Sequence, residues 1–371
     1  DSQTFRRMFL TVLCIGIATS GASSAFCDEA ADHPSSLLSA IQVVGPLSFC
    51  GESVPMNDPE VLERLEKELM ISLWDRPQVL LWLKRSRRYF PIIETVLKEN
   101  DLPDDLKYLA VAESALRPHA GSPRGAMGFW QFMPETARRY GLRVDRSMDD
   151  RRSIFKSTAA AVRYLTELYE DFGGWALAAA AYNMGEEGLK AEILAQGLTE
   201  YHRLYLPLET QRYLFRILSV KLIFEAPERY GFHLGENDYY PPLSFESIDV
   251  ECPEETLLTV VAQAAGTDFK RLKDLNPEIR GHYLEKGRHA ILGPPGSADG
   301  FEGRFRRAFK AWVRDRQERI YVVQAGDSLS TIAEQFEVPL PALLIWNRID
   351  ISKPIHPGER LVIYRGAGEI R

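Results

Sequence analysis

The sequence is poor in cysteine and histidine, and it lacks an excess of basic charge. Its 371 residues include 4 Cys and 7 His; no CxxC pair occurs, and the His residues show no paired ligand spacing. We therefore expect no metal site, and nothing in the sequence implies a cofactor. The formal net charge of -7 argues against nucleic acid as the main partner.

Long apolar runs are also absent, apart from a short one near the N-terminus. It lies within residues 6–25, after a pair of arginines and before a stretch of small residues. A membrane-spanning helix needs roughly 20 apolar residues, so this shorter run is typical of a secretory signal. We expect cleavage after Ala25 and export to the periplasm or cell envelope. Cys27 leaves open a lipid anchor, and hence membrane association through the N-terminus, although the bulky Phe26 disfavours it.

Hydrophobic periodicity predicts a mainly α-helical protein, in which two small units of mixed structure follow the helices. The expected segments are a signal peptide (1–25), a linker (26–57), N-terminal helices that pack on the core (58–100), a helical domain (101–235), a strand–helix–helix–strand unit (244–297), a basic helical connector (298–318) and a second strand–helix–helix–strand unit (319–364). The sequence leaves the oligomeric state open.

One predicted helix carries an acidic residue on its apolar face. Leu106, Leu109, Ala110 and Glu113 share a stripe at helical spacing. We expect the helix to end at the Arg-Pro pair 117–118, because a residue before proline avoids the α region. Burial and the helix C-terminus both raise the pKa of a carboxyl group, as a general acid requires. The alternative is a structural glutamate paired with that arginine.

Two further stretches place polar residues in apolar surroundings. Residues 121–142 form a glycine-containing loop that includes Gln131, and 175–189 is a nearly apolar helix with Tyr182 and Asn183 at one end. These three side chains predict a binding site, although each alone also fits a surface position. The aromatic residues around Gln131 fit either core packing or stacking on a ligand: Phe129, Trp130 and Phe132.

Three motifs in order resemble the lytic transglycosylases, and the membrane-bound murein transglycosylases of the D type match best. The motifs are ES at 113–114, GAMGFWQ at 125–131 and AYN at 181–183. The similarity extends from residue 101 to about residue 235 and includes ETQRYLFRIL at 209–218. It implies a lysozyme-like helical domain that cleaves the β-1,4 bond between N-acetylmuramic acid and N-acetylglucosamine in peptidoglycan.

The same resemblance implies roles for individual residues. Glu113 would be the single acid/base, and the reaction would end in a 1,6-anhydromuramic product. The side chains that would line the glycan cleft are Ser114, Gln131, Tyr182 and Asn183. Peptidoglycan glycan strands would be the partner.

The C-terminal segment 320–364 resembles a LysM module, a small βααβ unit that binds N-acetylglucosamine in glycan chains. The resemblance implies four glycan-binding residues: Gly326, Asp327, Ser328 and Ile349. We expect Asp327 to cap the first helix of this module. The 244–297 unit looks like a degenerate copy, because Pro253-Glu254 stands where the module has Gly-Asp. We do not assume that this copy binds sugar.

Two other functions stay open from the sequence. One is a goose-lysozyme-like hydrolase, which would need a second carboxylate. Its candidates, Asp145, Asp149 and Asp150, lie in a charged stretch that we expect to be a loop without an apolar setting. The other is an inactive wall-binding scaffold that acts through its LysM module.

A disulfide is a further possibility in an oxidising compartment. Cys50 and Cys252 would tie the segment before the catalytic domain to the degenerate module, with Cys27 as a competing partner.

Overall fold

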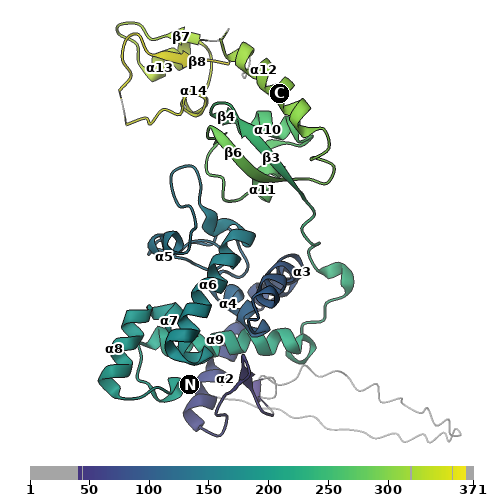
Figure 1. The fold of residues 1–371 in the computed structure, drawn as a ribbon, viewed down its shortest axis with the longest axis vertical. Helices are drawn as coiled ribbons and strands as arrows, with labels where there is room; N and C mark the ends of the chain where they lie inside the picture. Colours follow the sequence, from purple (N-terminus) through teal and green to yellow (C-terminus); the bar gives the residue numbers. More distant parts are fainter. Residues whose placement is uncertain (1–40, 44, 318–319, 353, 365–371) are drawn as a thin grey trace, which may run out of the picture.

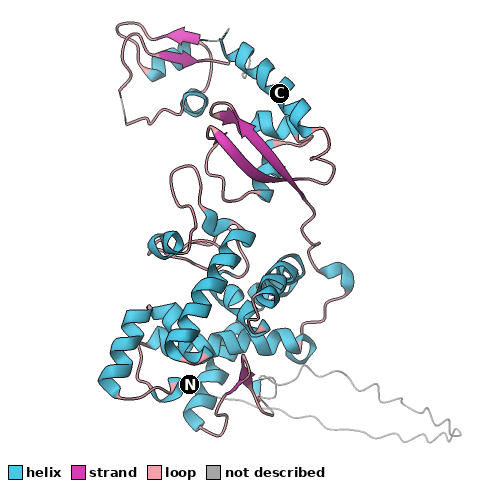
Figure 2. Cartoon of the chain, in the orientation of Figure 1, coloured by secondary structure: helices cyan, strands magenta, loops and turns pink. Residues whose placement is uncertain are grey.

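The computed structural model describes residues 41–43, 45–317, 320–352 and 354–364. The predicted signal peptide, its cleavage site and Cys27 lie outside the described residues. A helical body forms one end of the molecule, and the strands of the two C-terminal units lie at the other (Figures 1 and 2). The predicted mainly α-helical fold is confirmed.

The chain enters the helical body through a short hairpin, which lies inside the predicted linker. Strands β1 (Ser48–Phe49) and β2 (Glu52–Ser53) pair antiparallel, and Phe49 is buried in the main core. The Glu52 carboxylate accepts hydrogen bonds from the backbone N–H groups of Trp175 (2.5 Å) and Ala176 (3.1 Å). These two bonds use N–H groups that a helix start leaves unpaired, so this part of the chain is fixed to the catalytic domain.

Two long helices follow, as predicted. They are α2 (Pro59–Trp74) and α3 (Arg76–Glu99). Asp58 caps α2 by accepting from the Glu60 N–H, and Asp75 between the helices caps α3 by accepting from the Gln78 N–H.

The body is completed by the helices after α3; among them, α9 (Leu208–Glu225) packs against α2, α4 (Lys107–Ser114) and α7 (Trp175–Met184). In chain order they are η1 (Asp104–Leu106), α4 (Lys107–Ser114), α5 (Pro134–Arg139), η2 (Asp150–Arg152), α6 (Ile154–Phe172), α7 (Trp175–Met184), α8 (Glu186–Gln196), η3 (Tyr201–Arg203), α9 (Leu208–Glu225), η4 (Pro227–Tyr230) and η5 (Glu236–Asp238). The three aromatics of the 125–132 stretch are all buried in this core, which settles their role as packing rather than stacking on a ligand.

The degenerate module has the predicted order of strand, helix, helix and strand. Strand β3 (Glu246–Cys252) pairs antiparallel with β6 (Gly287–Gly293), and β4 (Thr256–Leu257) with β5 (Tyr283–Leu284). Between them lie α10 (Leu258–Ala264) and α11 (Phe269–Leu275). Helix α12 (Phe301–Gln317) is a packed connector, since its apolar stripe is buried in the core of this module.

The LysM module contains β7 (Ile320–Val322), α13 (Leu329–Gln335), α14 (Leu340–Asn347) and β8 (Arg360–Val362). It has a separate hydrophobic core. Within the described ranges, no helix combines the length and the apolar character needed to cross a bilayer.

Both cysteines of the described chain are free, so the proposed disulfide between them does not form. Cys50 packs against the core of the helical body, whereas Cys252 lies inside the core of the degenerate module. The two thiols therefore belong to different cores.

Candidate active site

Glu113 lies in the last turn of α4, and its carboxylate is half-buried. The helix ends at Ser114, three residues before the predicted Arg-Pro stop. Ala115 (φ 54°) and Leu116 (φ 56°) both adopt the left-handed conformation, and consecutive left-handed residues cannot continue a right-handed helix. The turn thus leaves Glu113 close to the C-terminal end of its helix.

Tyr213 on α9 is the direct partner of this carboxylate. Its hydroxyl donates a 2.5 Å hydrogen bond to Oε1 of Glu113, and its side chain is only 1% exposed. The alternative partner considered from sequence, Arg117, instead donates from Nε to the Ser114 carbonyl. Glu113 is therefore not a structural glutamate neutralised by the adjacent arginine.

The environment raises the pKa of Glu113 to about 7, mainly because burial disfavours the charged form. The Tyr213 hydrogen bond and the charge of Arg216 act in the opposite direction, and the charge of Glu209 adds to the rise. A carboxyl group with a pKa near neutrality can both give and take a proton at that pH. The predicted pKa rise of Glu113 is thus present in the structure.

Gln131 is held in an uncommon backbone conformation, with a φ of 48°. Its Nε2 donates to the carbonyls of Ala120 and Gly128, both at 2.9 Å. The amide nitrogen is therefore used within its own loop, whereas the side-chain oxygen accepts no hydrogen bond from the described residues. This orientation leaves the carbonyl of Gln131 as the group able to accept from a ligand.

Tyr182 lies near Glu113. Burial and the charges of Glu113 and Tyr164 raise the pKa of Tyr182 well above its ordinary value, so the phenol stays protonated. Its hydroxyl donates to the carbonyl of Trp130 at 2.7 Å. This bond connects the end of α7 to the loop that carries Gln131.

The side chains of the two other predicted cleft residues, Asn183 and Ser114, make their hydrogen bonds to groups other than Glu113. The side-chain oxygen of Asn183 accepts from the Thr210 hydroxyl at 2.9 Å, which joins α7 to α9. Ser114 is 3% exposed and its hydroxyl donates to the Ala110 carbonyl of its own helix. A cleft role for Ser114 stays a prediction that this geometry does not favour.

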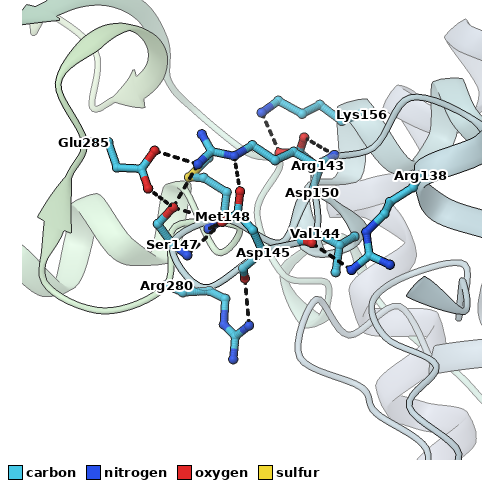
Figure 3. A network of polar contacts seen from close by, with 10 residues as sticks. All are labelled: Arg138, Arg143, Val144, Asp145, Ser147, Met148, Asp150, Lys156, Arg280 and Glu285. Atoms are coloured by element: carbon cyan, nitrogen blue, oxygen red, sulfur yellow. Dashed lines mark hydrogen bonds and ion pairs between the residues drawn. The ribbon is translucent and has the colours of Figure 1, made fainter. Parts of the chain in front are cut away.

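The acidic loop differs from expectation. Asp149 and Asp150 are buried rather than lying in a loop without apolar surroundings. Asp149 forms a pair with Arg151 (2.8 Å), and Asp150 forms one with Lys156 (2.7 Å). Asp145 lies in the network of Figure 3 and accepts from Arg143 and from the backbone of Ser147 and Met148.

These partners identify the three aspartates as structural. Although burial opposes the effect, the hydrogen bonds from Arg143 and the loop backbone lower the pKa of Asp145. No charge from any of the three contributes to the pKa shift of Glu113. None of them is therefore placed as a second catalytic carboxylate.

The predicted LysM residues lie at the starts and ends of its helices. Gly326 has a φ of 94°, and Asp327 accepts from the Tyr321 hydroxyl and the Gln324 N–H, both at 2.7 Å. Because this carboxylate is used in the turn, the cap of α13 is Ser328 and not Asp327. Ile349 follows α14 and packs against the core of the module.

Sequence reasoning missed Tyr213, whose hydroxyl donates to the Glu113 carboxylate. The sequence held a clue to it, because Tyr213 lies within the ETQRYLFRIL stretch that resembles the predicted family, 100 positions after Glu113.

The described residues contain no group of three or more His, Cys, Asp and Glu side chains suited to a metal ion.

Comparison with known proteins places the chain in a class. The profile of the transglycosylase SLT domain matches residues 90–203, and that of the LysM domain matches residues 321–363. The chain thus combines a transglycosylase-type domain with a glycan-binding type of module. Two relatives from strains of Escherichia coli, both named membrane-bound lytic murein transglycosylase D, are 31% identical over 338 residues. The match covers 87% of this chain and 74% of each relative.

The chain belongs to the family of membrane-bound lytic murein transglycosylases D. This confirms the family predicted from the three motifs and the C-terminal LysM module. Solved structures with similarity to the chain include the 70 kDa soluble lytic transglycosylase from Escherichia coli, with 17% identity and a TM-score of 0.34. Another is a lytic transglycosylase from Pseudomonas aeruginosa, with 20% identity and a TM-score of 0.30. The matches cover 48% and 40% of this chain, and 32% and 26% of those structures.

Proposed function

We propose that Glu113 is the single acid/base of a peptidoglycan lytic transglycosylase. The substrate bond is the β-1,4 linkage between N-acetylmuramic acid and N-acetylglucosamine. The observation that carries the assignment is a half-buried carboxyl group whose pKa is raised to about 7 and which a buried tyrosine holds in place. A reaction with a single carboxylate requires one group that first donates a proton and then accepts one.

In the first step, protonated Glu113 gives its proton to the glycosidic oxygen, and the bond from this oxygen to C1 of the muramic residue breaks. The N-acetyl carbonyl of that sugar assists at C1. Glu113 is then a carboxylate, and the Tyr213 hydroxyl stabilises it by a hydrogen bond. It removes the proton of the C6 hydroxyl, and O6 bonds to C1 to form the 1,6-anhydro ring. No water is consumed, and Glu113 ends protonated again.

The C6 hydroxyl has an advantage over water because it belongs to the sugar already bound. The charge of Glu209 adds to the rise of the Glu113 pKa. This residue is exposed in the first turn of α9, one turn before Tyr213. In this mechanism Glu209 is an electrostatic neighbour and takes no proton.

Substrate contacts come from the loop and helix end beside Glu113. Gln131 offers its side-chain oxygen to an amide N–H of the glycan, and its nitrogen holds the loop. Tyr182 and Asn183 shape the wall between α7 and α9, with Ser114 as a buried support. The LysM residues Gly326, Asp327, Ser328 and Ile349 bind the glycan strand separately from catalysis.

The enzyme works in the cell envelope, where peptidoglycan is found. We place it in the periplasm after export by the N-terminal signal, with membrane association through that terminus as the alternative to a soluble product. The relatives' name, which includes the term membrane-bound, supports an envelope location.

The test is digestion of purified sacculi followed by mass spectrometry of the fragments. The parent protein should produce 1,6-anhydromuramic ends, one water lighter than hydrolysis products. Glu113→Gln should lose at least 100-fold in rate, in keeping with the 10²–10⁴-fold typical of general acid–base catalysis. Glu209→Gln should still give anhydro ends. Predominantly hydrated ends would make the protein a hydrolase and would overturn the mechanism.

A further inference from the structure

The degenerate module is fastened to one loop of the catalytic domain, residues 143–153, here termed the clamped loop. The backbone N–H of Asp149 donates to the Glu278 carbonyl at 2.8 Å, and the N–H of Arg280 donates to the Ser147 carbonyl at 2.7 Å. Backbone hydrogen bonds of this kind fix the position of the loop relative to the module without depending on flexible side chains. The two units therefore share a short piece of β-structure.

Apolar packing supports the same junction. Met148 of the clamped loop and Ile279 of the module form an isolated antiparallel bridge. Ile279 is 1% exposed, and Met148 packs against the hydrophobic core of the module. A side chain of the catalytic domain thus completes the core of the next unit.

Side chains add a polar layer, seen in Figure 3. The Glu285 carboxylate accepts from Arg143 Nη2 and from the Ser147 hydroxyl, each at 2.6 Å. Arg280 donates from Nη1 to the Asp145 carbonyl at 2.9 Å. Each exposed ion pair alone is worth little, but the bonds converge on one loop.

The clamped loop in turn supports the segment that carries Gln131. Within it, the buried Asp149 carboxylate accepts two bonds from Arg151, at 2.8 and 2.9 Å. Nη1 of Arg151 donates to the carbonyls of Gly125 (2.8 Å) and Phe132 (3.0 Å). Gly128 passes so close that an added Cβ would lie 1.8 Å from the Arg151 carbonyl oxygen.

We propose that the degenerate module is a positioning element for the transglycosylase reaction, with Glu285 and Arg280 as positioning residues. It holds the clamped loop, which holds the segment 125–132. That segment carries Gln131 and the Trp130 carbonyl to which Tyr182 is bonded. The module thereby maintains the substrate-binding side of the active site.

This inference rests on the proposed function, and its test uses the full chain. The double variant Arg280→Ala/Glu285→Ala removes the polar layer while leaving α4 and α9 untouched. On soluble glycan fragments, kcat/KM should fall about tenfold, because small misplacements of positioning groups are costly. The loss should lie mainly in KM, since Gln131 binds substrate while Glu113 and Tyr213 keep their contact.

Hydrogen exchange supplies a readout independent of activity. In the double variant, amides of 121–132 should exchange faster, and those of α4 should be unchanged. The matched control is Glu251→Ala/Arg288→Ala, an exposed ion pair (3.0 Å) on the same module, which should behave as the parent.

Four outcomes separate the possibilities. A tenfold rise in KM, together with faster exchange confined to the amides of 121–132, supports the positioning role. Unchanged kinetics in the double variant overturn it, whether or not exchange changes. Faster exchange throughout the catalytic domain also overturns it, because the module would then be a general stabiliser. Absence of turnover in the parent would instead refute the proposed function.

Discussion

The hydrogen bond between Tyr213 and Glu113 makes a quantitative prediction for Tyr213→Phe. The substitution removes one buried hydroxyl and keeps the ring that packs in the core. Hydrogen bonds to charged groups contribute roughly 1.5–3 kcal/mol, and one pKa unit corresponds to about 1.4 kcal/mol. Because the protonated carboxyl group also keeps some of this bond, we expect the Glu113 pKa to rise by about one unit.

The direction of the pH dependence is set by the proton that Glu113 donates. The reaction begins from protonated Glu113, so the activity of the parent should fall as the pH rises through about 7. In Tyr213→Phe this alkaline limb should move upward by about one unit. At pH 5 the Glu113 carboxyl group is protonated in both proteins. The variant should then be about tenfold slower, because the Glu113 carboxylate formed in the reaction no longer receives the hydrogen bond of the Tyr213 hydroxyl.

At pH 8 the defect should shrink to about twofold, since about half of the variant but only about a tenth of the parent is then protonated. The assay is kcat/KM on soluble glycan fragments between pH 4.5 and 9. Tyr201→Phe is the matched control, because Tyr201 is also buried and donates its hydroxyl to the Thr210 carbonyl at 2.8 Å. An alkaline limb that stays in place, or moves downward, would refute the reasoning.

Two other perturbations test stability and wall binding. Since the folded-state pKa of Glu113, about 7, lies above the ordinary value of 4.5 for a glutamate, its contribution to stability is present at low pH and is lost as the pH rises from about 4.5 to 7. Glu113→Gln should therefore be more stable than the parent at pH 8, by up to about 3 kcal/mol, and similar to it at pH 4.5; equal melting temperatures at pH 8 would contradict this. Deletion of residues 319–371 should weaken sedimentation with sacculi yet leave cleavage of soluble fragments nearly unchanged, because a tethering module raises local substrate concentration without adding chemistry. The separate core of the LysM module makes this deletion feasible, and equal sedimentation of both proteins would exclude wall anchoring.

The sequence was sufficient to predict the helical character, the family and the position of Glu113 on a helix. These features depend on local pattern: apolar spacing at 3.6 residues predicts helices, and three motifs in order are specific where one is not. The βααβ order of both C-terminal units was also predictable, since strand and helix signals alternate there. The ends of helices were harder to predict. Helix α4 ends at two consecutive residues in the left-handed conformation, and neither of them is a glycine.

Burial of the acidic loop could not be predicted, because a run of charged residues usually indicates a solvated surface. Asp149 and Asp150 are paired with Arg151 and Lys156, and the backbone N–H of Asp149 donates to the carbonyl of Glu278 in a later unit. Arg151 and Lys156 are neighbours in the sequence, whereas Glu278 reaches the loop only in the folded chain. The supposed pairing of Cys50 with Cys252 failed for the same reason, as spacing along a sequence does not reveal which core each thiol enters.

By itself, the sequence determined that Glu113 lies on an apolar helix face in a lytic transglycosylase-type domain followed by a LysM module. Only the tertiary structure decided what acts on that carboxyl group. Tyr213 is 100 residues away along the chain and reaches Glu113 because α4 and α9 pack together. A pKa depends on the neighbours within a few ångströms in space, and a local pattern in the sequence does not specify them.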